Sequence, residues 1–300
     1  MIRLGIIDCD SSHSIEFTRR LNHVGLPADQ LVQGAQVVCA VAGPSVMSPE
    51  RVPIFTSQLE SCGVELLDRP EDVIGRVDAV LVLSVCGGTH RERVEPILRA
   101  GLPAYVDKPF ACTLADAEAI FGLAAENNVA VWSSSAMRFS QELLDFAAKT
   151  SLYGAVQGAL SYGPAKLADG NPGLFHYGIH PVEMLFTLMG PGCEQVRCDW
   201  TEGAETVTGH WADGRLGTVR GTRTGATYYG AVAFCDNSVV TIPASARYGY
   251  RNLCREIVRA FETGQPPVPP EQTLEIVRFV LAAEQSRQSA GQSVRLADVG

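Results

Sequence analysis

The chain has 300 residues, of which 46% are hydrophobic and 19% charged, a balance that excludes disordered and collagen-like proteins and leaves room for two domains. Its 24 basic and 33 acidic residues give a net charge of −9, so no overall positive field draws in nucleic acid or an anionic membrane surface. No stretch has the character of a signal peptide or approaches the roughly 18 apolar residues of a membrane span, and we expect a cytoplasmic protein. The nine cysteines are scattered and never spaced C-x-x-C, which argues against a disulfide framework and against a cysteine-ligated zinc site.

Short β-rich runs alternate with helical patterns over residues 1–135. We expect strands at 2–7, 36–41, 64–67, 79–85, 103–106 and 129–132, and helices at 15–21, 49–61, 90–100 and 114–126. The run AVLVLSV at 79–85 is apolar on both faces, which is typical of a strand buried between two helical layers. The pattern predicts an α/β domain with a Rossmann-like, doubly wound parallel sheet, whose ligands bind at the carboxyl ends of the strands.

The pattern changes over residues 136–300. An apolar helix is expected at 179–189, followed by strand-like segments separated by turn residues at Gly203, Gly214, Gly225 and Asn237. Such spacing is typical of an antiparallel sheet. Two more helices are expected at 251–262 and 273–289, with a proline-rich connector between them. The second half therefore predicts an α+β domain with a mainly antiparallel open sheet.

Three segments together resemble the glucose-fructose oxidoreductase, inositol dehydrogenase and MocA family. They are AYVDKPFACTLADA at 104–117, WSSSAMRFSQELL at 132–144 and FHYGIHPVEMLFTLMG at 175–190. They correspond in order to the family's Glu-Lys-Pro motif, its entry into the second domain, and its Asp-x-Gly-x-His helix. The resemblance implies an oxidoreductase that uses NAD or NADP and forms a homodimer or homotetramer.

Two residues are expected to be catalytic. Lys108 stands in the place of the lysine of the Glu-Lys-Pro motif, with Asp107 replacing the glutamate. The resemblance implies that its ammonium reaches both a nicotinamide ribose and a substrate hydroxyl, whereas an isolated loop lysine would simply be solvated. His180 matches the histidine of the Asp-x-Gly-x-His pattern and is expected to exchange a proton with the substrate, because an imidazole titrates near neutrality.

Substrate binding is expected at His176, Arg138 and Glu183. On a single helix, His176, His180 and Glu183 would project toward one pocket. His176 replaces the family's aspartate, and a packed, hydrogen-bonded histidine explains it equally well. The same spacing permits a His-His-Glu metal site, although nothing else supports one and we predict no metal. Arg138 alternatively pairs with a nearby acid.

The expected nucleotide site departs from the family. A loop G-x-G-x-x-G should follow the first strand, because its glycines let backbone amides approach the pyrophosphate. Asp8, Asp10 and His13 stand at the three glycine positions. A carboxylate about 5 Å from a phosphate charge costs on the order of 3 kcal/mol at an effective dielectric near 20, or about a hundredfold in affinity. In NAD enzymes an acidic residue at the end of the second strand usually binds the ribose hydroxyls. Here the second strand leads into Gly43, and no such acid is present.

The cofactor is accordingly predicted to be NAD or NADP, without a choice between them. The residues expected to line its site are Asp8, Asp10, Ser11, Ser12, His13, Gly43, Ser84, Cys86, His90, Asp107 and Lys108, of which His90 also has a structural interpretation. The leading hypothesis is a dehydrogenase or reductase acting on a sugar, polyol or related hydroxy compound. The alternative is a family member that has lost conventional dinucleotide binding and acts as a ligand-binding or scaffold protein.

Overall fold

The computed structural model describes residues 1–300, and the chain divides into two compact units. The first comprises Met1–Ser134 and Tyr250–Pro270, and the second comprises Ser135–Gly249 and Glu271–Gly300. The chain passes between these units three times, because the segment after Gly249 returns to the first unit before the chain ends in the second.

The first unit contains a six-stranded parallel sheet. Its strands are β1 (Ile2–Ile7), β2 (Ala35–Val41), β3 (Glu65–Leu67), β4 (Ala79–Val82), β5 (Ala104–Val106) and β6 (Val131–Trp132), in the order β3-β2-β1-β4-β5-β6. This confirms the doubly wound sheet predicted from the sequence. The strand order reverses between β1 and β4, and ligands of such sheets bind outside the carboxyl ends of the strands at that point.

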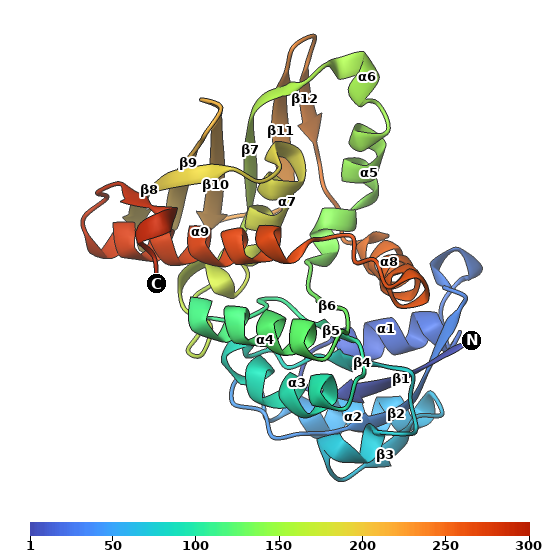
Figure 1. Ribbon diagram of the computed structural model, residues 1–300. Helices are drawn as coiled ribbons and strands as arrows, with labels where there is room; N and C mark the ends of the chain where they lie inside the picture. Colours follow the sequence, from blue (N-terminus) through green and yellow to red (C-terminus); the bar gives the residue numbers. More distant parts are fainter. The chain divides into compact units, whose positions relative to one another are not determined.

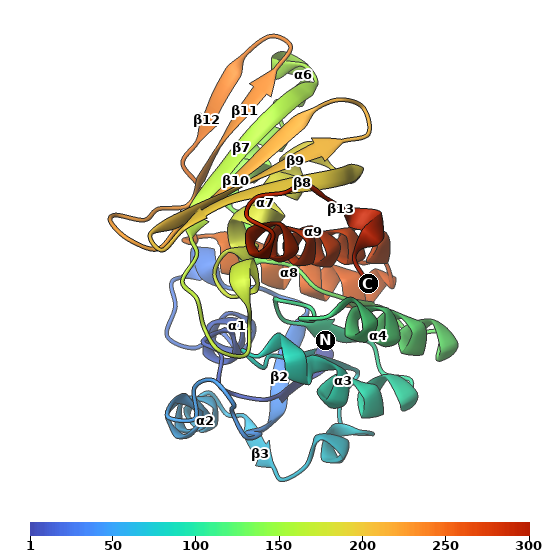
Figure 2. The same ribbon diagram turned by 90° about the vertical axis from the view of Figure 1, so that its left-hand side faces the viewer.

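Helices cover both faces of this sheet. They are α1 (His13–Leu21), α2 (Arg51–Ser61), α3 (His90–Arg99) and α4 (Leu114–Glu126), with α1 and α2 on one side and α3 and α4 on the other (Figure 2). The Oγ1 of Thr113 accepts a hydrogen bond from the amide of Asp116 at 3.1 Å and caps α4. Helix α8 (Gly249–Thr263) adds Tyr250, whose ring lies 5.1 Å from that of His13 on α1.

An exposed ion pair joins β1 to the residue before β4. Arg3 Nη2 lies 2.8 Å from Asp78 Oδ1, and the Arg3 amide donates to Oδ2 at 2.8 Å. These hydrogen bonds lower the pKa of Asp78 to about 2. Because the folded-state pKa lies below its ordinary value, the contribution of the pair to stability is present above about pH 4 and is lost as the pH falls toward 2.

We expect Asp78→Asn to lower the urea midpoint by well under 1 M at pH 7, since about half of each side chain is exposed and solvent screens the pair. At pH 2 the variant and the original chain should unfold at nearly the same urea concentration. Urea titrations at the two pH values check this, and an equal loss at both would contradict the assigned role of ionised Asp78.

The second unit contains a seven-stranded sheet. Its strands are β7 (Val156–Pro164), β8 (Cys193–Thr201), β9 (Ala204–Trp211), β10 (Leu216–Thr222), β11 (Gly230–Cys235), β12 (Val239–Ile242) and β13 (Val294–Arg295), in the order β12-β11-β7-β10-β9-β8-β13. Neighbouring strands are antiparallel except β7 and β10, which pair in parallel. The predicted, mainly antiparallel sheet is confirmed.

Two helices cover one face of this sheet, α7 (Ile179–Met189) and α9 (Pro270–Gln288), while the opposite face is left uncovered by helices (Figures 1 and 2). The rings of Phe186 on α7 and Phe279 on α9 lie 5.5 Å apart in the core between helices and sheet. Two short helices, α5 (Gln141–Ala147) and α6 (Thr150–Tyr153), precede β7. The sequence predicted the bounds of α7 and did not predict α5 and α6.

None of the helices combines the length and the apolar character that crossing a membrane requires. All nine cysteines are free thiols.

Candidate functional site

The loop between β1 and α1 lies at the switch point of the parallel sheet, and its first residue, Asp8, is buried. Asp8 has a backbone φ of 64°, and its Oδ2 accepts hydrogen bonds from Ser84 Oγ at 2.5 Å and from Arg93 Nε at 3.0 Å. Its Oδ1 is buried without a hydrogen-bond partner. Burial raises the pKa of Asp8, although the hydroxyl and the guanidinium oppose that shift.

Gly43, which follows β2, makes room for this carboxyl group. A Cβ at Gly43 would lie 1.7 Å from Asp8 Oδ1, and Gly43 has a φ of +64°. We therefore expect Gly43→Ala to destabilise the fold by about 2–4 kcal/mol, from left-handed backbone strain together with displaced hydrogen bonds of Asp8.

The matched control for this substitution is Gly122→Ala, because Gly122 lies inside α4 with open space around its Cα. Alanine there should stabilise the unit by about 0.5–1 kcal/mol through helix propensity. Thermal unfolding of both variants measures the two effects, and a neutral Gly43→Ala variant would show that Asp8 does not need this space.

Asp10 links three strand ends. Its Oδ2 accepts from Ser45 Oγ at 2.6 Å, and its Oδ1 accepts from the amide of Val85 at 3.0 Å. Ser45 follows β2 and Val85 follows β4, whereas Asp10 itself follows β1. The residue Asp10 is 3% exposed. Asp10 therefore binds the loop that follows β2, where dinucleotide-binding proteins usually place the acid for the ribose hydroxyls.

His13 and Asp107 form a buried pair at the third glycine position. His13 Nδ1 lies 2.7 Å from Asp107 Oδ2, with side chains only 5% and 1% exposed. Asp107 Oδ2 also accepts from Ser11 Oγ at 3.3 Å, and its Oδ1 accepts from the amide of Lys108 at 2.8 Å. Burial opposes ionisation of Asp107, yet His13 and Lys108 hold its pKa below the ordinary value.

Ser11 accepts hydrogen bonds from the backbone amides at the N-terminus of α1. Its Oγ accepts from the amide of His13 at 3.2 Å, and its carbonyl accepts from the amide of Ser14 at 3.1 Å. Amides at this position bind phosphate in ordinary dinucleotide sites. With those donors engaged and two carboxylates at glycine positions, the residues of this loop do not fit a pyrophosphate. Ser12 is the exposed residue of the loop.

The remaining residues predicted for the cofactor lie after β4 and β5. His90 is fully buried, and its two ring nitrogens face the backbone carbonyls of Ser84 at 2.9 Å and of Phe110 at 3.1 Å. These contacts agree with the structural interpretation of His90. Cys86 is buried next to this turn, and Lys108, half-buried, precedes a cis peptide bond to Pro109.

In the second unit, His180 lies in the first turn of α7 and is 8% exposed. Its Nδ1 lies 2.6 Å from Ser135 Oγ, and its ring packs edge-on against Tyr229 with centroids 5.5 Å apart. The hydroxyl fixes the orientation of the imidazole. The sequence did not identify Ser135 as a site residue, because this contact spans 45 positions and leaves no local pattern.

The expectation that His176 shares a helical face with His180 and Glu183 is wrong. Helix α7 begins at Ile179, and His176 precedes it with a ψ of −98° at the end of a short 3-10 turn. Pro172 and two glycines near the turn keep the helix from extending backward, since such residues favour turns. No group of three His, Cys, Asp or Glu side chains is arranged to hold a metal ion.

Arg138 and Glu183 contact each other. Arg138 Nε donates to Glu183 Oε2 at 2.7 Å, and Nη2 lies at the same distance from that oxygen. The side chains are 9% and 6% exposed. Arg138 Nη1 also donates to Gln272 Oε1 on α9 at 3.3 Å. This pairing matches the alternative interpretation of Arg138 and ties α7 to the 3-10 turn at Ala136–Phe139.

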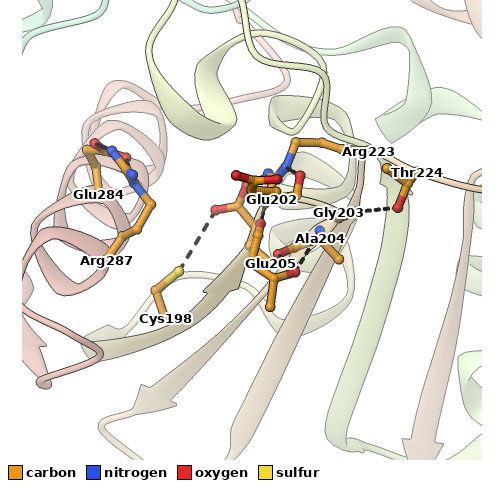
Figure 3. A network of polar contacts seen from close by, with 10 residues as sticks. Cys198, Glu202, Gly203, Ala204, Glu205, Arg223, Thr224, Glu284 and Arg287 are labelled. Carbon is orange, nitrogen blue, oxygen red and sulfur yellow. Dashed lines mark hydrogen bonds and ion pairs between the residues drawn. The ribbon is translucent and has the colours of Figure 1, made fainter.

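A second polar cluster, not predicted from the sequence, gathers residues of β8, β9 and α9 together with Arg223, which follows β10 (Figure 3). Glu205 Oε1 accepts from Arg223 Nη1 at 2.5 Å, and Glu284 pairs with Arg287. Burial raises the pKa of Glu205 against the lowering by Arg223. Both guanidinium groups lie over Trp200, at 5.2 and 5.3 Å from its ring centre. A cavity of about 580 Å³ adjoins the cluster, but its charged pairs already neutralise each other.

A family model matches part of the first unit. The model of the oxidoreductase family with an NAD-binding Rossmann fold, GFO_IDH_MocA, matches residues 25–135. No curated protein matches the chain.

Solved structures match the fold along almost the whole chain. One is scyllo-inositol dehydrogenase from Lactobacillus casei with bound NAD(H) and scyllo-inositol, at 15% identity and a TM-score of 0.81, covering 99% of this chain and 100% of that one. Another is a myo-inositol dehydrogenase from Corynebacterium glutamicum ATCC 13032, at 15% identity and a TM-score of 0.80, covering 99% of each chain. A third is an oxidoreductase from Agrobacterium radiobacter in complex with NAD⁺, L-tartaric acid and magnesium, at 14% identity and a TM-score of 0.77, covering 99% of this chain and 98% of that one. At such identities these matches show the fold alone. Residues 25–135 thus resemble the oxidoreductase family with an NAD-binding Rossmann fold, and the solved structures agree with the fold of both units.

Proposed function

We propose that this protein oxidises or reduces a CH–OH group of a sugar, polyol or related hydroxy compound with NAD or NADP as the cofactor. The observation that carries the proposal is the family match of the Rossmann unit, and the buried imidazole of His180, held by Ser135, supports it. The inositol dehydrogenases with the same fold favour a polyol substrate.

The proposed roles concern protons and orientation. We assign proton exchange with the substrate hydroxyl to the imidazole of His180, whose Nδ1 Ser135 contacts. To the ammonium of Lys108 we assign the orientation of a substrate hydroxyl. His176, half-buried beside Tyr177, supplies a further polar contact to the substrate. Arg138 and Glu183 support the site by fixing α7, rather than by binding substrate as charged groups.

The test is turnover. Purified protein should interconvert a polyol and its ketone, followed as nicotinamide absorbance with a panel of inositols, sugars and hydroxy acids at millimolar NAD⁺ or NADP⁺. Absence of turnover with every substrate, in folded protein and at saturating nucleotide, would remove the proposal.

A second candidate function is ligand binding without redox chemistry. The observation that favours it is the loop from Asp8 to His13, whose residues do not fit a pyrophosphate. A polyol that binds the protein with unchanged affinity in the presence and absence of nucleotide, and is never turned over, would support this candidate over the first.

We also propose that copies of the chain associate through the uncovered face of the antiparallel sheet. Phe234, Leu216 and Val239 are 47%, 50% and 66% exposed on β11, β10 and β12. Exposed apolar side chains on one sheet face are typical of an interface. Sedimentation equilibrium compares the self-association of the original chain with that of a Phe234→Lys variant.

A further inference from the structure

We propose that the loop from Asp8 to His13 is an internal plug that weakens dinucleotide binding, and that the charge of Asp10 is its main barrier. The inference rests on the proposed function, since it concerns the cofactor of that reaction. It names the residue that sets cofactor affinity, which the family match leaves open because that match begins at residue 25, after α1.

Each of the three side chains that replace a glycine has a partner on a different part of the sheet. Asp8 is held by Ser84 and Arg93, after β4 and on α3. Asp10 is held by Ser45, after β2, and by the Val85 amide. His13 is held by Asp107, after β5. The loop is therefore an assembled polar network, and not a glycine loop with incidental substitutions.

Other positions accommodate these side chains. Gly43 leaves the space that the Asp8 carboxyl group occupies. Asp107, one methylene shorter than the glutamate of the family motif, pairs with His13 at 2.7 Å. Ser11 takes the amides of His13 and Ser14. A pyrophosphate at the start of α1 would have to displace these contacts, and each displaced buried group costs free energy unless the ligand satisfies it.

The charges of the network are unequally compensated. Asp8 lies 3.0 Å from the Arg93 guanidinium, and Asp107 lies beside His13 and Lys108. The two hydrogen bonds to Asp10 come from uncharged donors, a hydroxyl and an amide. Of the three carboxylates, Asp10 is therefore the one whose negative charge is least neutralised by its neighbours. For a phosphate charge about 5 Å from a carboxylate, the repulsion weakens affinity by about a hundredfold.

The variant that tests the plug is Asp10→Asn, which keeps the shape of the side chain and removes its charge. We expect it to tighten NADH or NADPH binding by about tenfold to a hundredfold in fluorescence titrations. Glu71→Gln, at an exposed position of the same unit, changes net charge equally and should leave the affinity unchanged. Equal dissociation constants for the original chain and Asp10→Asn, or weaker binding by the variant, would overturn the proposal.

A second measurement needs no substitution. The original chain should bind ADP-ribose no more tightly than adenosine, because the diphosphate gains nothing at the plugged loop; a tenfold preference for ADP-ribose would overturn the proposal. Failure of the proposed function is a separate result: tighter nucleotide binding by Asp10→Asn with no turnover of any polyol supports the plug and rejects the dehydrogenase. Turnover of a polyol by the original chain, together with micromolar affinity for NADH, would reject the plug and support the dehydrogenase.

Discussion

Replacing His180 by alanine should lower kcat for polyol oxidation by about 10²–10⁴-fold, the usual contribution of a positioned acid-base group. The imidazole is 8% exposed in the first turn of α7, and Ser135 holds its Nδ1 at 2.6 Å. Its removal takes away the proposed proton acceptor while leaving the hydrophobic face of α7 intact. Steady-state kinetics at saturating substrate, with the melting temperature as a check on folding, measure the effect.

Two variants separate chemistry from positioning. Ser135→Ala keeps the imidazole and loses its hydrogen bond, so kcat should fall by about tenfold or less, with a shifted pH profile. His176→Asn, outside α7, should act mainly on KM. A His180→Ala variant with unchanged kcat would remove His180 from the reaction, whatever the fold of the chain.

Glu183→Ala should destabilise the protein by about 3–5 kcal/mol, because it leaves the Arg138 guanidinium buried without its counter-charge. Arg138 and Glu183 lie 2.7 Å apart with side chains 9% and 6% exposed. Urea unfolding measures the loss. An exposed pair serves as the control: Asp199→Asn, whose partner Arg197 is 58% exposed, should change stability by no more than about 0.5 kcal/mol.

The double variant Arg138→Met with Glu183→Leu completes this experiment. Well-packed apolar replacements of a buried ion pair are often neutral or stabilising, so the double variant should recover most of the stability that Glu183→Ala loses. If Glu183→Ala unfolds like the original chain and only raises KM, the pair serves substrate binding, as the sequence predicted, and not the packing of α7.

The sequence predicted the fold in detail because periodicity and local signals are strong in these elements. The apolar run at β4 and the alternation of strand and helix patterns indicated element types and order, and helices α4 and α7 have the predicted bounds. The return of Tyr250–Pro270 to the first unit was not predicted. An amphipathic helix shows that it has a partner, but its sequence does not say which sheet supplies one.

The site was less predictable, because its contacts join distant positions. The three lost glycines were visible in the sequence, whereas the partners of the new side chains were not: Arg93 lies 85 positions from Asp8, and Val85 lies 75 from Asp10. Helical spacing misplaced His176, since the chain turns before Ile179. The sequence indicated which residues were candidates for the site, but only the structure shows which charged side chains neutralise each other.

The threefold crossing of the chain bears on how the protein is made. During synthesis Met1–Ser134 emerges from the ribosome long before Tyr250–Pro270. In that interval the ring of Tyr250 does not yet cover the surface around His13 and Phe17. Vectorial synthesis therefore leaves that apolar surface uncovered until nine-tenths of the chain has emerged, an interval in which nascent chains are prone to aggregate or to need a chaperone.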